Sequence, residues 1–294
     1  MTEKRHKLRL LFSIEELTIL IRVLSLSKIQ MKHNPRIALV FSGGGARGAF
    51  QIGAWEALQE LGLSEYITGV YGTSVGAING AAFVQQDLDL AKEVWSKLSY
   101  NNIFAGISEE DLSLRARKRY YKWVKDAIKD RGMDVSPLKE ILRSSLKEDV
   151  LRENPVDFGL VTYNLTNRSA QYLTKQDIPQ GDLVEYVIAS ATFPTFQPHR
   201  IEGSLYLDGG IVDNRPVGFL TDDSTLDCII CVDVTMARHF WTSKRKVGNN
   251  KVYFIRPSRL LGSPLAFKTD KIDRNMLLGY QDGLKQLQDL MRKI

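Results

Sequence analysis

The sequence predicts an α/β protein, built as a three-layer α/β/α sandwich around a mainly parallel central sheet. Residues 37–41 form a short, continuous apolar run of the kind found in buried parallel strands. A glycine-rich turn and a helical pattern of apolar residues follow, and the same order recurs between residues 69 and 84. Strands that alternate with helices favour a parallel sheet covered on both faces. With 294 residues, 44% hydrophobic and 25% charged, the chain can bury one large core.

The N-terminal residues differ from the rest of the chain in charge. The net charge is +6, and the first 36 residues hold eight basic and three acidic side chains, a balance of +5. We therefore divide the chain into a basic helical extension, residues 1–34, and one domain, residues 35–294. A basic, partly apolar extension is compatible with contact to an anionic membrane surface. A solvated helix packed on the domain is the alternative interpretation.

Two features favour a cytoplasmic location. Charged residues interrupt the apolar stretch 8–26, and no small-residue cleavage site follows it, so we expect no export signal. Cys228 and Cys231 are too few for a disulfide framework, and their spacing in a strand turns them to opposite faces of the sheet. We expect two buried core thiols in a reducing compartment rather than a redox pair. Peripheral contact with a membrane is compatible with this location.

The middle of the chain has a polar helical pattern, and strands return after it. In residues 87–151, Ser136 and Pro137 are typical of a helix start, with serine as the N-cap. Basic and aromatic side chains cluster at 115–123, where a lipid-facing lid and a solvated helix face are the competing interpretations. Strand patterns then occur at 156–163, 171–174, 204–207, 228–234 and 252–255, and residues 271–291 predict a closing helix.

A serine flanked by glycines stands where the second predicted strand meets its helix. Gly72, Thr73, Ser74, Val75 and Gly76 match the Gly-x-Ser-x-Gly nucleophile elbow, in which a sharp strand-to-helix turn exposes the serine. Such a turn strains the backbone at the serine and brings neighbouring chains close, so glycine is needed on both sides. The amides and positive dipole end of the following helix favour negative charge near Ser74. The pattern predicts that Ser74 is a nucleophile.

Residues 43–48, which we name the glycine loop, stand between the first strand and the first helix. As Gly-x-Gly-x-x-Gly the loop fits a dinucleotide-binding turn, but the next strand ends in Gly-Thr-Ser and lacks the acidic residue that this function requires. As an oxyanion hole, the loop would present backbone amides, with Gly44 and Gly45 as candidates. Arg47 would support the loop, attract a lipid phosphate or form a structural salt bridge. The other glycines of the loop are Gly43 and Gly48.

A serine hydroxyl is a poor nucleophile at neutral pH and needs a base within hydrogen-bonding reach. Asp208 follows the strand pattern 204–207 and opens an Asp-Gly-Gly turn. An Asp-Gly pair is a common turn sequence, so the pair alone does not assign a role. Asp208 is nevertheless our candidate for the base.

With these three motifs the chain resembles the patatin-like phospholipase family. That family carries a Gly-Gly-Gly-x-Arg/Lys-Gly loop, a Gly-x-Ser-x-Gly elbow and an Asp-Gly-Gly/Ala turn in the order found here. Residues 189–194 and 208–216 also look like family blocks, and the resemblance covers residues 37–216. It implies a Ser-Asp dyad that acts without histidine and without a metal on acyl esters of lipids. Ser74 would be the nucleophile, Asp208 the base and the glycine loop the oxyanion hole.

A histidine triad is the alternative arrangement. The order Ser74, Asp208, His239 matches that of α/β-hydrolases, and His199 and His239 are the histidines available in the domain. The sequence around His239 has no mark of a positioned catalytic loop, so we expect both histidines to be ordinary surface or partly buried residues.

We therefore expect a serine lipid acyl hydrolase of the phospholipase A or lysophospholipase type, acting through an acyl-enzyme. Its partner would be a phospholipid or another fatty acyl ester, with transient membrane-surface contact and no nucleic acid. We expect no cofactor and no metal, because the histidines and cysteines lack zinc-ligand spacing. A dinucleotide-binding oxidoreductase that uses the glycine loop and a catalytically silent lipid-binding protein are the alternative functions.

Overall fold

The computed structural model describes residues 34–105, 132–235 and 246–292. Three sequence features therefore lie outside the described residues: the basic extension apart from its last residue, the cluster at 115–123, and His239. The division of the chain at residue 34 stays a prediction.

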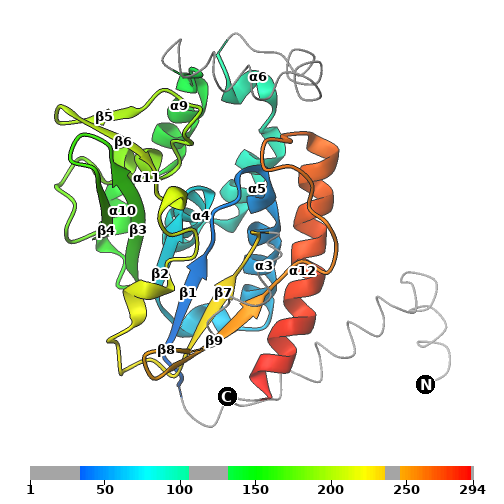
Figure 1. Ribbon diagram of the computed structural model, residues 1–294. Helices are drawn as coiled ribbons and strands as arrows, with labels where there is room; N and C mark the ends of the chain where they lie inside the picture. Colours follow the sequence, from blue (N-terminus) through cyan, green and yellow to red (C-terminus); the bar gives the residue numbers. More distant parts are fainter. Residues whose placement is uncertain (1–33, 106–131, 236–245, 293–294) are drawn as a thin grey trace.

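A nine-stranded sheet runs through the described residues, and five parallel strands form its centre in the order β3-β2-β1-β7-β9 (Figure 1). Antiparallel strands extend this centre: β4 and β6 pair with β3, β5 pairs with β6, and β8 pairs with β9. The predicted α/β class with a mainly parallel sheet is thus confirmed. The strands are β1 (Ile37–Phe41), β2 (Ile67–Thr73), β3 (Asp157–Asn164), β4 (Ser169–Thr174), β5 (His199–Ile201), β6 (Ser204–Asp208), β7 (Cys228–Val232), β8 (Lys246–Val247) and β9 (Asn250–Ile255).

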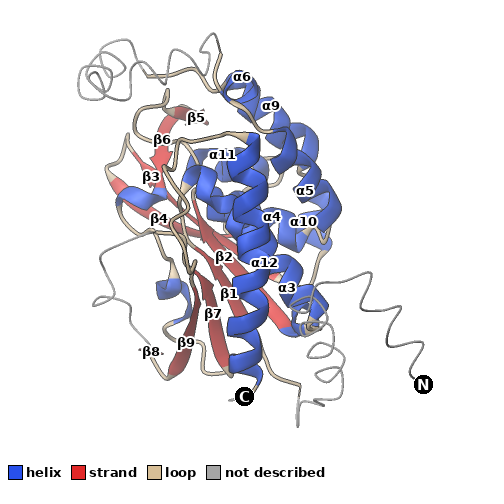
Figure 2. Cartoon of the chain, turned by 90° about the vertical axis from the view of Figure 1, so that its right-hand side faces the viewer, coloured by secondary structure: helices blue, strands red, loops and turns tan. Residues whose placement is uncertain are grey.

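Most of the helices gather on one face of the sheet (Figure 2). The described α-helices are α3 (Ala49–Glu60), α4 (Val75–Val84), α5 (Leu88–Lys97), α6 (Tyr100–Ile103), α9 (Ser136–Ser145), α10 (Glu148–Glu153), α11 (Leu183–Ser190) and α12 (Thr269–Met291). Short 3-10 helices are η1 (Gly45–Gly48), η2 (Leu63–Tyr66), η3 (Gly209–Ile211) and η4 (Val217–Leu220). Within the described ranges, no helix combines the length and the apolar character that a bilayer crossing requires.

Alternate residues of the central strands face two separate cores, as the two-residue period of a strand requires. In β7, Cys228 and Ile230 belong to a large core shared with the helices. Ile229 and Cys231 belong to a smaller core on the other face, which η4 covers in the described part of the chain. Both thiols are fully buried and lie on opposite faces, as predicted.

Several element boundaries differ from the predicted ones by one or two residues, and two of these differences concern residues that the sequence analysis names. Ser136 is the first residue of α9 and not its N-cap. Its amide and its hydroxyl both donate to the Asp134 carboxylate, at 2.8 and 2.6 Å. A charged acceptor forms stronger hydrogen bonds than a neutral one, so the Ser136 hydroxyl binds Asp134 and does not cap the helix. Strand β6 extends one residue beyond the predicted end and includes Asp208.

The helices α3 and α12 pack closely, and glycines allow the close approach (Figure 1). A β-carbon placed on Gly53 of α3 would lie 1.9 Å from the carbonyl oxygen of Met276, and one on Gly279 of α12 would lie 2.0 Å from that of Phe50. A backbone carbonyl cannot move aside as the end of a flexible side chain can, so residues larger than glycine do not fit at these two positions.

We expect Gly279→Ala to lower the free energy of unfolding by about 1–2 kcal/mol. Overpacking typically costs about 1–3 kcal/mol, with a cost near the upper end expected for a contact with backbone, and alanine recovers roughly 1 kcal/mol over glycine inside a helix. Urea unfolding measures the difference. The control is Leu277→Ala on the same helix, where the side chain is 57% exposed and a change within about 0.5 kcal/mol is expected. Equal stability of Gly279→Ala and the natural protein would contradict the packing argument.

Candidate active site

The turn between β2 and α4 has the geometry of a nucleophile elbow. Ser74 lies at φ 59° and ψ −131°, a backbone conformation that residues other than glycine rarely adopt. A β-carbon on Gly72 would lie 2.2 Å from the Gly76 carbonyl oxygen, and one on Gly76 would lie 2.2 Å from the Phe41 carbonyl oxygen. The strain at the serine and the need for both glycines agree with the sequence prediction.

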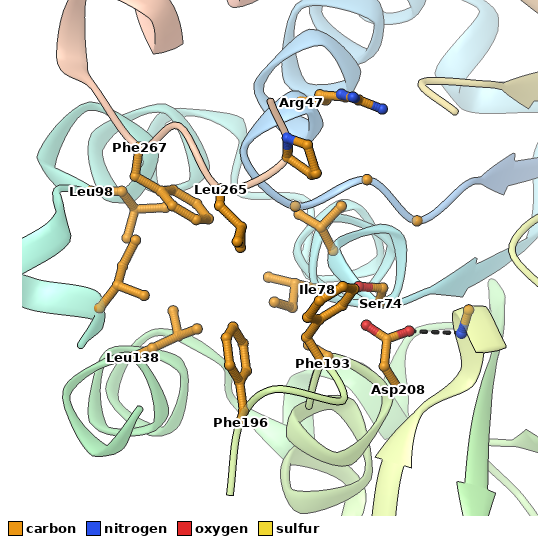
Figure 3. Close-up of a pocket in the computed structure, with 18 of the residues that line it drawn as sticks. Arg47, Ser74, Ile78, Leu98, Leu138, Phe193, Phe196, Asp208, Leu265 and Phe267 are labelled. Atoms are coloured by element: carbon orange, nitrogen blue, oxygen red, sulfur yellow. Dashed lines mark hydrogen bonds between the residues drawn. The ribbon is translucent and has the colours of Figure 1, made fainter. Parts of the chain in front are cut away.

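Strand β3 brings Asp208 to this elbow. Thr73, at the end of β2, pairs with Val161 of β3, and the next residue of β3, Thr162, pairs with Asp208 at the end of β6. Strand β4 occupies the other edge of β3, so β2 and β6 follow one another along a single edge and the residues at their ends become neighbours there. Figure 3 shows the Ser74 and Asp208 side chains beside each other at one end of a cavity.

The Asp208 carboxyl is almost completely buried, with 3% of the residue exposed. Burial raises its pKa from the ordinary 3.8 to about 6, although hydrogen bonds from the Ser74 hydroxyl and the Gly210 amide act in the opposite direction. The Gly210 amide donates to Oδ1 at 2.7 Å, the bond drawn in Figure 3. The buried carboxyl thus has two hydrogen-bonded partners and a pKa of about 6.

The glycine loop passes directly beside the serine. A β-carbon on Gly43 would lie 3.1 Å from the Ser74 Cβ, and the Gly43 amide donates to the Asn214 carbonyl at 3.0 Å. Within the described ranges, no hydrogen bond is found from the amides of Gly44 and Gly45. The two amides that the sequence analysis selects are therefore available as donors, whereas that of Gly43 is already used.

Arg47 supports the loop through backbone contacts. Its Nε donates to the Gly262 carbonyl at 2.8 Å, and burial lowers the pKa of its guanidinium. The ion pairs between described residues do not include Arg47. In Figure 3 the Arg47 side chain lies apart from Ser74, although Arg47 is among the residues that line the cavity. Of the roles considered from the sequence, support of the loop is the one that these contacts match.

A largely apolar cavity of about 370 Å³ extends from the Ser74 and Asp208 side chains. Its volume falls in the range of small-molecule sites. Leu98, Leu138 and Phe267 lie at the end opposite Ser74 (Figure 3). An elongated apolar group could therefore occupy the cavity with one end at the serine hydroxyl.

Two residues of the segment 189–194 hold the backbone of the candidate pair, and the sequence analysis gave neither a role. Ser190 Oγ accepts from the strained Ser74 amide at 3.0 Å and donates to the Val161 carbonyl at 2.7 Å. The Thr192 carbonyl accepts from the Asp208 amide at 2.7 Å. The end of α11 thus positions both residues. The only sequence signal for it was the resemblance of this segment to a family block.

The described histidine does not belong to the site. His199 is buried, its Nε2 lies 2.9 Å from the Glu185 carboxylate, and it is absent from the cavity lining. Desolvation by burial lowers its pKa, against the opposing effect of the Glu185 carboxylate. Among the described residues no cluster of three or more histidine, cysteine or acidic side chains could hold a metal ion.

The family model described as patatin-like phospholipase matches residues 39–221. The chain belongs to the patatin-like phospholipase family. The matched residues include the glycine loop, the elbow, the segment 189–194 and Asp208. The resemblance noted from the motifs is thereby confirmed.

The curated relatives of this patatin-like chain are longer proteins. An uncharacterised NTE family protein of Mycobacterium tuberculosis is 27% identical over 191 residues, which are 65% of this chain and 47% of that protein. Lysophospholipase NTE1 of Chaetomium globosum is 31% identical over 199 residues, 67% of this chain and 12% of that protein. The chain therefore spans about half of the first relative and a small part of the second.

A solved structure shares the patatin-like fold. Human GIVD cytosolic phospholipase A2, in complex with a methyl γ-linolenyl fluorophosphonate inhibitor, superposes with a TM-score of 0.52 at 14% identity. The superposition covers 96% of this chain and 64% of that one. At this identity the similarity concerns the fold alone.

We expect Ser190→Ala to lower the free energy of unfolding by about 1–3 kcal/mol, because it leaves a buried amide and a buried carbonyl without partners. Urea unfolding measures the loss. The matched control is Ser144→Ala, which removes an exposed serine hydroxyl bonded to the Ile141 carbonyl and should cost no more than about 0.5 kcal/mol. Equal effects of the two substitutions would show that Ser190 does not hold the elbow.

Proposed function

We propose that this protein is a serine acyl hydrolase that cleaves fatty acyl esters of lipids, with Ser74 as the nucleophile and Asp208 as the base. The observation that carries the proposal is the contact of the Ser74 hydroxyl with the buried Asp208 carboxyl at the end of an apolar cavity. Family membership supports a lipid substrate, and one relative is named a lysophospholipase. A phospholipid or a lysophospholipid is thus the substrate class that we propose.

In the acylation step, the Asp208 carboxylate takes the proton of the Ser74 hydroxyl as Oγ attacks the ester carbonyl carbon. The carbonyl oxygen becomes an oxyanion, which the amides of Gly44 and Gly45 stabilise by hydrogen bonds. When the intermediate collapses, the bond to the alcohol oxygen breaks and Asp208 returns the proton to the leaving alcohol. Ser74 then carries the acyl group as an ester.

In the deacylation step, Asp208 takes a proton from water, and the resulting hydroxide attacks the acyl carbon of the Ser74 ester. The same amides stabilise the second oxyanion. Asp208 gives the proton back to Ser74 Oγ, and the fatty acid leaves. One carboxyl serves as base and acid in both steps, for which a pKa near neutrality is well suited.

Exposed apolar side chains at the cavity support transient contact with a lipid surface. Phe193 and Ile211 both line the cavity and are 37% and 47% exposed. Apolar side chains placed at an entrance favour a substrate that is delivered from a lipid aggregate. We therefore propose a cytoplasmic enzyme with peripheral membrane contact, to which the basic N-terminal residues contribute attraction for anionic lipids.

The alternative functions have less support. A dinucleotide at the glycine loop would need an acidic residue at the end of β2, where Thr73 precedes Ser74. A silent lipid-binding protein would have no need of a strained serine beside a buried carboxyl. A triad would need a histidine at Asp208, and His199 is engaged with Glu185.

We expect a fluorophosphonate probe to label the natural protein and not Ser74→Ala, with ester hydrolysis reduced by about a thousand-fold or more. Gel fluorescence of the labelled protein and the rate of ester cleavage are the measurements. A folded natural protein that resists labelling would favour the lipid-binding or dinucleotide alternative. His239→Ala is the control and should retain labelling; its loss would favour the triad.

The pH profile of the reaction should follow the ionisation of Asp208. The base acts as carboxylate, so kcat/KM should rise with pH through a midpoint of about 6 and level off above it. Stability should change in the opposite direction. Because the folded-state pKa is raised, the stabilising contribution is complete below the unfolded value of about 3.9 and is lost as pH rises through about 6.

Rate profiles and urea unfolding from pH 4.5 to pH 8, taken in about unit steps, test both trends. Asp208→Asn is the control: it should be inactive and should lack the part of the stability change that falls between the unfolded-state pKa of about 3.9 and the folded-state pKa of about 6. A rate profile with its midpoint near 4 would mean that the carboxyl is not the perturbed group that the proposal requires.

A further inference from the structure

Residues 261–267, which we name the closing segment, lie within the connection between β9 and α12 and beyond the matched family region of residues 39–221. They nevertheless contribute Pro264, Leu265 and Phe267 to the wall of the cavity. A part of the candidate site is thus built from residues that none of the sequence motifs includes.

The closing segment is fixed to the site by hydrogen bonds. Asn275 Nδ2 of α12 donates to the Leu261 carbonyl at 3.1 Å. The Arg47 guanidinium donates to Gly262, and the Ala46 amide donates to the Pro264 carbonyl at 2.7 Å. Two of these bonds come from the glycine loop, so the distance between the loop and the closing segment is set by direct contact.

The last residue of the closing segment lies far from the serine. In Figure 3 the Phe267 ring lies beside Leu98, across the cavity from Ser74 and Asp208. Phe267 also packs on the large hydrophobic core, which limits its freedom to move aside. An ester whose carbonyl carbon lies at Ser74 would therefore direct its acyl chain toward this ring.

We propose that Phe267 sets the acyl-chain length that the site accepts, by closing the end of the cavity opposite the nucleophile. This inference rests on the proposed acyl hydrolase function. A chain that is too short leaves part of the apolar wall uncovered, and a chain that is too long meets the ring. Phe267 is a specificity-determining residue in this account and takes no part in the chemistry.

The test is kcat/KM of Phe267→Ala and of the natural protein on soluble p-nitrophenyl esters, from butyrate to palmitate. The optimum should move to longer chains in the variant. Each methylene that the variant can bury and the natural protein cannot should raise kcat/KM about fourfold relative to the natural protein. Leu138→Phe, which narrows the same end from α9, should move the optimum to shorter chains.

The exposed Leu277→Ala serves as the control and should leave the chain-length profile unchanged. If Phe267→Ala fails to fold by circular dichroism, Phe267→Leu takes its place with a smaller shift expected. An equal loss at every chain length, or an unchanged optimum, would overturn the role of Phe267. Failure of the natural protein to cleave any ester would instead overturn the proposed function itself.

Discussion

Strand β3 joins the two reactive side chains of the candidate site. Along one edge it pairs first with β2, which ends at the elbow, and then with β6, which ends at the acid, and the change occurs between the adjacent residues Val161 and Thr162. The Val161 carbonyl also accepts the hydrogen bond of Ser190, whose oxygen holds the Ser74 amide. Sheet register, elbow strain and the position of the acid therefore all depend on two consecutive residues of one strand.

The parts of the site that could be predicted from the sequence are those whose geometry is dictated locally. The glycine loop and the elbow follow from the steric demands of residues that are contiguous in the chain, and the strain at Ser74 follows from them. The alternation of Cys228 and Cys231 across the sheet follows from the two-residue period of a strand.

The remaining features depend on contacts between distant elements. Ser190 acquires its role because the end of α11 meets both β3 and the elbow, and a lone serine carries no pattern for this. The closing segment meets the glycine loop through hydrogen bonds between residues more than 200 positions apart in the chain. The wrong prediction that Ser136 is an N-cap has a local cause. The Asp134 carboxylate accepts hydrogen bonds from the Ser136 amide and hydroxyl, and the sequence analysis did not take this carboxylate into account.

The closing segment is separate in the chain from the residues proposed to carry the chemistry. The proposed nucleophile, acid and oxyanion donors lie within residues 39–221, whereas Phe267 lies after β9. In the proposed account, changes in the C-terminal quarter of the chain alter which acyl chains are accepted while the residues proposed for catalysis are preserved. Related chains could therefore evolve different acyl-chain specificities while they keep the same catalytic reaction.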